Sequence, residues 1–477
     1  MIAWLAIAAL AQAPVSVGSK KFTESVVLGE LLAVVARDAG AEVEHRRELG
    51  GTRVVWEALR RGDIDAYVEY TGTLRAELVP DAGPGLAGLR DALAAEGLVL
   101  GPPLGFENTY ALATTPERAE ALGLVRISDL LAHPDLRLRL GNEFMDRADG
   151  WPSLRDAYGL PHTDVRGLDH DLAYRGLVAG DLDVMDAYTT DAELSAYGLV
   201  TLDDDRRHFP EYQAVPIWRA DLHPAVADGL ARLGGVLTAP QMAALNARAR
   251  IDRVPEAEVA AAFAHSELGM SAAVSEGPGW LARLLATTLD HLFLVGVSLG
   301  AGIVVAVPLG VVAARRERLG RVVLGVVGVV QTIPSLALLV VLIPVLGIGT
   351  LPALVALFLY SLLPIVRGTH AGLTGIDPAL QEAAVALGLT EGQRLWRVEL
   401  PLAARSILSG IQTAAVIDVG TATLGALIGA GGYGQPILTG IRLDDTALIL
   451  EGAVPAAVLA VGVSLLFDVV GRRVLWD

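Results

Sequence analysis

Apolar positions follow two different patterns, one before and one after about residue 270. The second part contains long uncharged stretches. Residues 292–314 are uncharged over 23 positions, which is enough for one membrane-spanning helix. Residues 322–366 are uncharged over 45 positions, and the glycine- and proline-containing run 347–352 predicts two spans joined by a tight turn. Two further apolar stretches, over about 406–430 and 446–470, bring the expected number of spans to five.

The first part alternates short apolar runs with segments of helical period. Residues 15–19 are expected to form a strand, and residues 23–39 an amphipathic helix begun by a Thr23 cap. Later strand-like runs lie at 98–100, 111–113, 136–140 and 184–185. This alternation predicts an α/β domain, in which loops at the strand ends supply ligand contacts.

Arginine positions predict the orientation of the five spans. One side of the membrane carries only Arg283 and Arg442. The other side carries Arg315, Arg316, Arg318, Arg321, Arg367, Arg394, Arg397, Arg405, Arg472 and Arg473. Since arginine accumulates in cytoplasmic loops, the arginine-rich side is predicted to be cytoplasmic and residues 14–270 extracytoplasmic.

The N-terminal residues agree with this orientation. An apolar run over 2–10 precedes Ala11-Gln12-Ala13, so residues 1–13 are typical of an export signal, although a positively charged start is missing. A buried first strand is the alternative.

Charge is distributed unevenly between the two parts. The net charge is −17, and residues 276–477 contain 13 acidic and 12 basic side chains, so almost all of the excess lies in the first part. An acidic surface argues against nucleic-acid binding. The chain has no cysteine, which excludes disulfides and thiol chemistry. No metal site, cofactor or catalytic residue is expected.

The positions of the two lysines indicate whether the chain could contain the phosphate-binding loop of an ATPase. Lys20 and Lys21 stand in Ser19-Lys20-Lys21-Phe22, so neither forms the Gly-Lys-Ser/Thr core of a phosphate-binding loop. An ATP-driven process would therefore need a separate ATPase chain.

A motif between the third and fourth expected spans lies on the predicted cytoplasmic side. Glu382-Ala383-Ala384 is followed by Gly388 and, after a further stretch, by Leu400-Pro401. This spacing resembles the coupling loop of ABC importer permeases, which implies a loop over about 378–404 that docks on the ATPase. An ordinary alanine-rich helix is the alternative. Because five spans enclose little space, a permease homodimer with two ATPase subunits is expected.

Seven motifs in the first part occur in the order seen in substrate-binding proteins for quaternary ammonium osmoprotectants, which the first part resembles. They are Gly18–Glu24, Leu49–Thr52, Asp63–Thr73, Glu107–Ala113, Arg147–Gly150, Asp186–Asp191 and Phe209–Tyr212. The resemblance implies a periplasmic-binding-protein-like (type II) clamp of two α/β lobes. The whole chain is thus expected to be a fused binding protein and all-α permease in the bacterial cytoplasmic membrane.

The expected domain boundaries follow from these patterns. Residues 14–270 form the clamp, with lobes over about 15–103 plus 214–270 and over 107–210. Residues 271–291 form a linker and an interfacial helix over 280–291, and residues 292–477 form the permease.

Four tyrosines match positions that build an aromatic cage in this family: Tyr70, Tyr110, Tyr188 and Tyr212. A trimethylammonium group has no N–H donor, so aromatic faces hold it by cation–π attraction. Ordinary core packing is the alternative for each ring. Tyr67 is a weaker candidate, because strand alternation places it on the face opposite Tyr70.

The resemblance places Lys20, Thr73 and Arg147 at the carboxylate end of a betaine. Arginine can grip a carboxylate bidentately. Alternatively, Arg147 pairs with Asp146 or Asp149 on the surface. Two cations favour glycine betaine or proline betaine as the ligand, with choline or carnitine as the alternative.

Two questions stay open at this stage. Asp418 lies within the fourth expected span and is either a pore-lining group or a buried, hydrogen-bonded or snorkelling carboxylate. A ligand-gated channel or receptor with a clamp-like outer domain is the alternative class of function, although it would lack a docking loop for a motor. A membrane-anchored enzyme is disfavoured, since no hydrolase or metalloprotease motif occurs.

Overall fold

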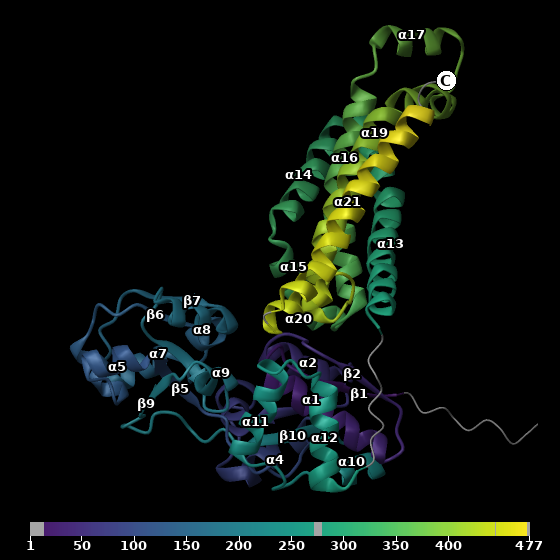
Figure 1. Cartoon of the computed structure of the whole chain (residues 1–477). Helices are drawn as coiled ribbons and strands as arrows, with labels where there is room; N and C mark the ends of the chain where they lie inside the picture. The colour runs from purple at the N-terminus through teal and green to yellow at the C-terminus, as the bar shows by residue number, and fades with distance from the viewer. Residues whose placement is uncertain (1–13, 271–278, 444, 475–477) are drawn as a thin grey trace, which may run out of the picture. The chain divides into compact units, whose positions relative to one another are not determined.

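The computed structural model describes residues 14–270, 279–443 and 445–474 (Figure 1). The predicted export signal and most of the predicted linker lie outside the described residues. The chain divides into two compact units, Met1–Glu276 and Gly277–Asp477. The first unit is α/β and the second is all helical.

A five-stranded sheet, in the order β2-β1-β3-β10-β4, forms the centre of the first lobe. β1 pairs in parallel with β2 and β3, whereas β10 is antiparallel to β3 and β4. The strands are β1 (Val15–Gly18), β2 (Val43–Arg46), β3 (Ala66–Tyr70), β4 (Leu98–Leu100) and β10 (Ala214–Arg219). The helices of this lobe are α1 (Thr23–Asp38), α2 (Thr52–Arg61), α3 (Thr71–Thr73), the π-helix η1 (Leu74–Leu78), α4 (Gly85–Ala95), α10 (Pro224–Ala231), α11 (Ala239–Arg250) and α12 (Glu256–Leu268).

Helix α1 differs from its sequence-based prediction. It was expected to be amphipathic and capped by Thr23, but Thr23 is its first helical residue and Phe22 occupies the N-cap position without a side-chain cap. Every residue from Glu24 to Ala36 is buried. The reason is that α1 packs against the sheet on one side and against α10, α11 and α12 on the other. A helix covered on all sides loses its polar face.

The second lobe contains two small sheets (Figure 1). One has the order β8-β5-β9 and is antiparallel, and the other pairs β6 with β7 in parallel. The strands are β5 (Tyr110–Thr114), β6 (Leu138–Gly141), β7 (Val165–Leu168), β8 (Met185–Tyr188) and β9 (Val200–Leu202). The helices are α5 (Pro116–Leu122), η2 (Ile127–Ala132), α6 (Asn142–Asp146), α7 (Trp151–Tyr158), α8 (His170–Ala179) and α9 (Ala192–Ala196).

The chain crosses between the lobes twice, and the two crossings run side by side. Glu107 and Gln213 form an isolated antiparallel bridge. The backbone N–H of Asn108 donates to the carbonyl of Tyr212 at 3.1 Å. Two adjacent connecting segments form a natural hinge, because a few backbone torsions in each can change the angle between rigid lobes.

Among its described residues, the second unit contains four helices that are long and apolar enough to cross a membrane, or five spans if a bent pair of helices counts as one. This agrees with the predicted number. Its elements are α13 (Trp280–Arg315), α14 (Glu317–Thr332), α15 (Ser335–Leu346), α16 (Thr350–Thr374), α17 (Pro378–Ala386), α18 (Glu391–Arg394), the π-helix η3 (Leu395–Glu399), α19 (Leu400–Thr421), the 3₁₀ helix η4 (Ala422–Ile428), α20 (Gly434–Leu443) and α21 (Thr446–Val474).

Two segments of this unit depart from the predicted spans. Residues 280–291 are the beginning of α13, which continues unbroken for 36 residues. The second span is bent by 97° between α14 and α15. Pro334 stands at this break, where it lacks the N–H that a continuous helix would use.

Glycines bring the central helices into close contact. A Cβ atom added at Gly410 of α19 would lie 2.6 Å from the carbonyl oxygen of Pro364 in α16 and 3.3 Å from the Cα of Gly368. In membranes, small residues at such crossings let helix backbones pack directly. The crossing of α16 and α19 therefore depends on the absence of a side chain at Gly410.

We expect Gly410→Leu to force α16 and α19 apart and to lower the thermal stability of the detergent-solubilised protein, at a cost of about 1–3 kcal/mol or more. The matched control is Gly462→Leu in α21, because a Cβ atom added at Gly462 would have no described atom within 4 Å. Thermal unfolding and the monodisperse fraction in size-exclusion chromatography are the measurements. Equal losses in both variants would contradict the assigned crossing.

Candidate ligand-binding site

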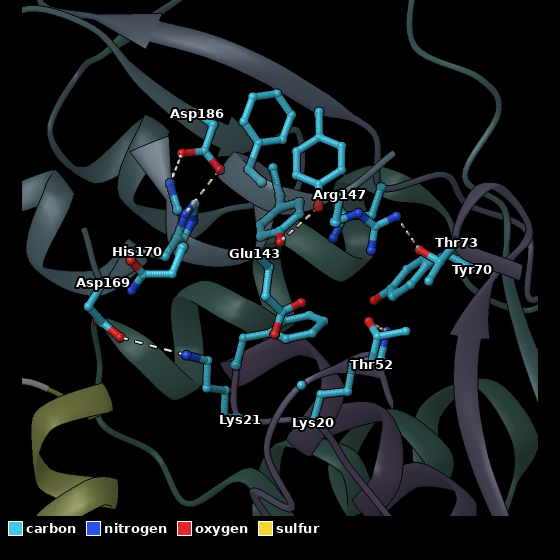
Figure 2. Close-up of a pocket in the computed structure, with 18 of the residues that line it drawn as sticks. Lys20, Lys21, Thr52, Tyr70, Thr73, Glu143, Arg147, Asp169, His170 and Asp186 are labelled. Carbon is cyan, nitrogen blue, oxygen red and sulfur yellow. Dashed lines mark hydrogen bonds and ion pairs between the residues drawn. The ribbon is translucent and has the colours of Figure 1, made fainter. Parts of the chain in front are cut away.

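A pocket between the two lobes of the first unit brings together every residue that was predicted to contact ligand (Figure 2). The first lobe and the crossings supply Lys20, Tyr70, Thr73 and Tyr212, and the second lobe supplies Tyr110, Arg147 and Tyr188. Tyr67 is not among the lining residues; it is fully buried, and its hydroxyl donates to Glu69 at 3.2 Å.

The tyrosines reach the pocket because they stand at the ends of strands. Tyr70 is the last residue of β3, Tyr188 is the last of β8, and Tyr110 is the first of β5. Tyr110 and Tyr188 are direct partners in the β5–β8 ladder, with ring centroids 5.0 Å apart. Tyr212 meets Tyr110 edge to face at 5.6 Å.

Phe22 completes this aromatic surface and was missed in the sequence. Its ring lies 5.8 Å from that of Tyr188 in a stacked orientation and 6.4 Å from that of Tyr70. It also lines the pocket, as does Phe144. Phe22 belongs to the motif Gly18–Glu24, so its position beside Lys21 was the available signal.

A glycine fixes the position of Tyr212. A Cβ atom at Gly72 would lie 2.4 Å from Cε1 of the Tyr212 ring. The ring thus rests directly on the backbone next to Thr73. The Tyr212 hydroxyl donates to Oδ2 of Asp149 at 2.5 Å, and the Tyr70 hydroxyl donates to Oε1 of Glu24 at 2.5 Å. The Tyr212 ring is therefore held at two points, and the Tyr70 ring is held through its hydroxyl.

Lys20 is buried and paired. Its Nζ donates to Oε1 of Glu69 at 2.6 Å and to Oγ1 of Thr52 at 3.1 Å. The same nitrogen lies 5.6 Å from the centroid of Tyr70. Glu69 is fully buried, so the pair is shielded from water and each charge depends on the other.

Arg147 lines the pocket and is also paired with one of the two aspartates that the sequence offered. It forms a two-pronged pair with Asp149, with Nε–Oδ1 at 2.7 Å and Nη2–Oδ2 at 2.6 Å. The pair is not on the surface, since both side chains are more than nine-tenths buried. Nη2 also donates to Oγ1 of Thr73 at 3.3 Å, across the lobes. Burial opposes the charge on Arg147, but Asp149 outweighs it and raises the pKa of the guanidinium.

A second group of polar residues also lines the pocket: Lys21, Glu143, Asp169, His170, Asp171 and Asp186. Figure 2 shows His170 beside Asp186, and Lys21 beside Asp169. Nε2 of His170 lies 2.9 Å from Oδ2 of Asp191, and Nδ1 lies 3.8 Å from Oδ2 of Asp186. Burial opposes protonation of the imidazole, but the two aspartates raise the pKa of His170 to about 10. The sequence carried no signal for His170.

The predicted coupling residues lie at one end of the second unit, where Figure 1 shows α17 beyond the long helices. Glu382, Ala383 and Ala384 are on α17, and Leu400 and Pro401 begin α19. Gly388 has a φ of +74°, a left-handed conformation that favours glycine. Several apolar side chains of this loop are exposed, among them Leu387 by 80% and Trp396 by 73%.

An ion-pair network supports the loop. Glu399 accepts from Nη2 of Arg315 at 3.0 Å and from Nε of Arg394 at 3.2 Å, which ties the start of α19 to the end of α13. Deeper in the unit, Asp418 of α19 is fully buried, and neither of its carboxylate oxygens has a hydrogen-bond partner among the described residues.

Two family models match the chain, one in each unit. Residues 13–266 match the substrate binding domain of ABC-type glycine betaine transport system. Residues 306–475 match the binding-protein-dependent transport system inner membrane component.

Curated relatives match the second unit. The chain is 41% identical over 191 residues to the choline transport system permease protein OpuBB of Bacillus subtilis, a match that spans 40% of this chain and 88% of that protein. It is 42% identical over 192 residues to the glycine betaine/carnitine/choline transport system permease protein OpuCB of the same organism, over 40% of this chain and 88% of that protein.

A solved structure described as a glycine betaine/carnitine/choline ABC transporter matches 54% of this chain and 100% of its own, at 27% identity and a TM-score of 0.46. On the strength of the two family matches, the chain belongs to the family of ABC-type glycine betaine transport systems, with a substrate-binding domain and an inner membrane permease component in one polypeptide.

Proposed function

We propose that this fused binding protein and permease imports glycine betaine or proline betaine, which it captures in the pocket between the two lobes. The observation that carries the proposal is the position of two cations directly beside the aromatic rings. Nζ of Lys20 lies 5.6 Å from the centroid of Tyr70, and Cζ of Arg147 lies 5.7 Å from the centroid of Tyr110. A short zwitterion needs both kinds of contact within a few ångströms.

The aromatic surface suits the ammonium end of such a ligand. A quaternary ammonium group cannot donate a hydrogen bond, and each desolvated ring attracts it by about 0.5–2 kcal/mol. Four tyrosines and Phe22 line the pocket together. The hydroxyls of Tyr70 and Tyr212 are already bonded to carboxylates, which leaves the rings as the interacting groups.

The carboxylate end has donors available despite the internal ion pairs. Nε and Nη2 of Arg147 are engaged, but Nη1 makes no hydrogen bond to any described residue. An ammonium has three donors, and Glu69 and Thr52 account for two of those on Lys20. The remaining donors of Lys20 and Arg147, with the hydroxyl of Thr73, belong to side chains that line the pocket.

One observation supports choline as the second candidate. Glu69 and Asp149 neutralise Lys20 and Arg147, so these pairs add no net positive charge to the pocket. A ligand that carries only a positive charge would then face no net repulsion from them. The role of Arg147 distinguishes the two ligands, because only a betaine presents a carboxylate to its unused donor.

Transport itself requires partners. The sequence contains no phosphate-binding loop, so we propose that two separate ATPase subunits dock on the coupling loops of a permease homodimer. The exposed Leu387 and Trp396 are apolar side chains that a docking groove would cover. Ligand closes the two lobes, and ATP binding by the partners moves the loops and opens the path through the membrane.

The ligand assignment is tested by calorimetric titration of the full chain in lipid nanodiscs with glycine betaine, proline betaine, choline and carnitine. We expect Tyr110→Ala to lose about 0.5–2 kcal/mol, or about two- to thirtyfold in betaine affinity. Tyr110→Phe should retain most of the affinity, because the ring remains. Arg147→Ala should weaken betaine binding by more than about tenfold.

The control for Arg147 is Arg139→Ala, which removes a second-lobe arginine that pairs with Asp164 and does not line the pocket. Choline binding that is unchanged in Arg147→Ala would favour the second candidate. Absence of binding by all four compounds would refute the proposed ligand class.

For the coupling loop, we expect Gly388→Ala to reduce ligand-stimulated ATP hydrolysis and uptake in proteoliposomes containing the ATPase, because a side chain at a φ of +74° costs about 1–2 kcal/mol. Glu382→Ala, in α17 of the same loop, should abolish uptake. Ligand binding should persist in both. Gly392→Ala, in α18 of the same loop, is the control. Loss of ligand affinity in either test variant would contradict the separation of capture from coupling.

His170 predicts a pH dependence of stability. Its pKa is raised from 6.5 to about 10 in the folded state, so its stabilising contribution is complete below pH 6.5 and is lost as the pH rises to 10. The pKa of Asp171 is about 6, raised mainly by burial, so that carboxyl is ionised before most of this window. The difference in melting temperature between wild type and His170→Gln should therefore shrink from pH 7 to pH 10. A difference in melting temperature that stays constant over this pH range would refute the prediction.

A further inference from the structure

Glu24 accepts four hydrogen bonds in the buried interior of the binding unit. Its Oε1 accepts from the Tyr70 hydroxyl at 2.5 Å and from Nδ2 of Asn108 at 2.9 Å. Its Oε2 accepts from Oγ1 of Thr190 at 2.5 Å and from Nδ2 of Asn246 at 2.9 Å. Four donors match the acceptor capacity of an ionised carboxylate.

The four donors come from different parts of the clamp. Tyr70 and Asn246 belong to the first lobe, on β3 and α11, and Asn108 belongs to a crossing segment. Thr190 belongs to the second lobe and stands two residues after Tyr188. Asn246 also donates from Nδ2 to the carbonyl oxygen of Thr190 at 2.9 Å. The complete set of contacts exists only when the two lobes meet.

Burial makes this set of contacts sensitive to closure. Glu24 is 3% exposed, and burial raises the pKa of its carboxyl against the four hydrogen bonds that lower it. A buried carboxylate is stable only when its hydrogen bonds are made. When Thr190 withdraws with the second lobe, Oε2 loses a donor, and the carboxylate that holds the Tyr70 hydroxyl through Oε1 is no longer fully hydrogen-bonded.

We infer that Glu24 is a positioning residue that couples lobe closure to the orientation of Tyr70 in the pocket. The inference rests on the proposed function in one respect, since Tyr70 is taken as part of the ligand cage. Glu24 does not line the main pocket, so it acts through Tyr70 and Thr190 rather than on the ligand. The same carboxylate therefore contacts the second lobe through Thr190 and orients the ring of Tyr70.

The test measures the distance between the lobes directly. Because the chain has no cysteine, Asp81→Cys in the first lobe and Asp156→Cys in the second place a pair of spin labels at exposed positions. Labelled full-length chain is diluted with unlabelled chain in nanodiscs. Pulsed electron paramagnetic resonance then gives the distribution of distances between the two labels, with and without glycine betaine. Titration calorimetry and thermal unfolding are run on the same variants.

The matched control is Glu30→Gln. Glu30 is also a buried carboxylate of α1, but it bonds to His45 and Arg47 within the first lobe. We expect Glu24→Gln to shift the distribution towards longer distances in both conditions and to weaken betaine binding by about tenfold or more. Glu30→Gln should lower the melting temperature without shifting the distance distribution. Thr190→Val should reproduce the Glu24→Gln result, and Thr190→Ser should restore the wild-type distances.

Unchanged distances between the spin labels in Glu24→Gln, or an equal shift to longer distances in Glu30→Gln, would overturn the inference. If wild type binds no betaine while Glu24→Gln still shifts the distribution to longer distances, the ligand assignment fails and the coupling of Glu24 to closure stands.

Discussion

The removal of charged side chains from water is the constraint on which the binding unit depends. Lys20 with Glu69, Arg147 with Asp149, and Glu24 with its four donors are all buried, and each is stable only with its partners in place. These partners come from several strands and from both lobes. The fold therefore fixes these charged groups in place through contacts within the protein itself.

Pairing also changes how the pocket selects its ligand. A site with two bare cations would attract any anion, whereas Lys20 and Arg147 each keep only part of their hydrogen-bonding capacity for a ligand. In the proposed site, selection then depends on geometry: a carboxylate has to reach the remaining donors while the ammonium lies against the rings. Gly72 contributes to this geometry, because it lets the Tyr212 ring lie against the backbone beside Thr73.

The sequence predicted the elements that repeat a local pattern. Strand ends, long uncharged helices and ordered motifs led to the α/β clamp, the helical membrane unit and the seven residues that the pocket brings together. It did not predict contacts between distant segments. Asp149 was one of two possible partners for Arg147, and Glu69 was not considered for Lys20, because pairing depends on which strands become neighbours.

The errors have the same physical origin. Helix α1 loses its polar face because α10, α11 and α12 cover it, which no local periodicity reveals. The sequence held no signal for His170, because the two aspartates that stabilise its protonated form are brought beside it only by the fold.

The presence of both units in one chain has a kinetic consequence. A separate binding protein must find its permease by diffusion, so its delivery rate depends on how much of it surrounds the membrane. Here the two units are joined covalently, so the concentration of one around the other does not depend on how much of the protein is present. The number of binding units per permease is fixed by the gene product, so uptake scales with the amount of this one chain and with how often its clamp opens.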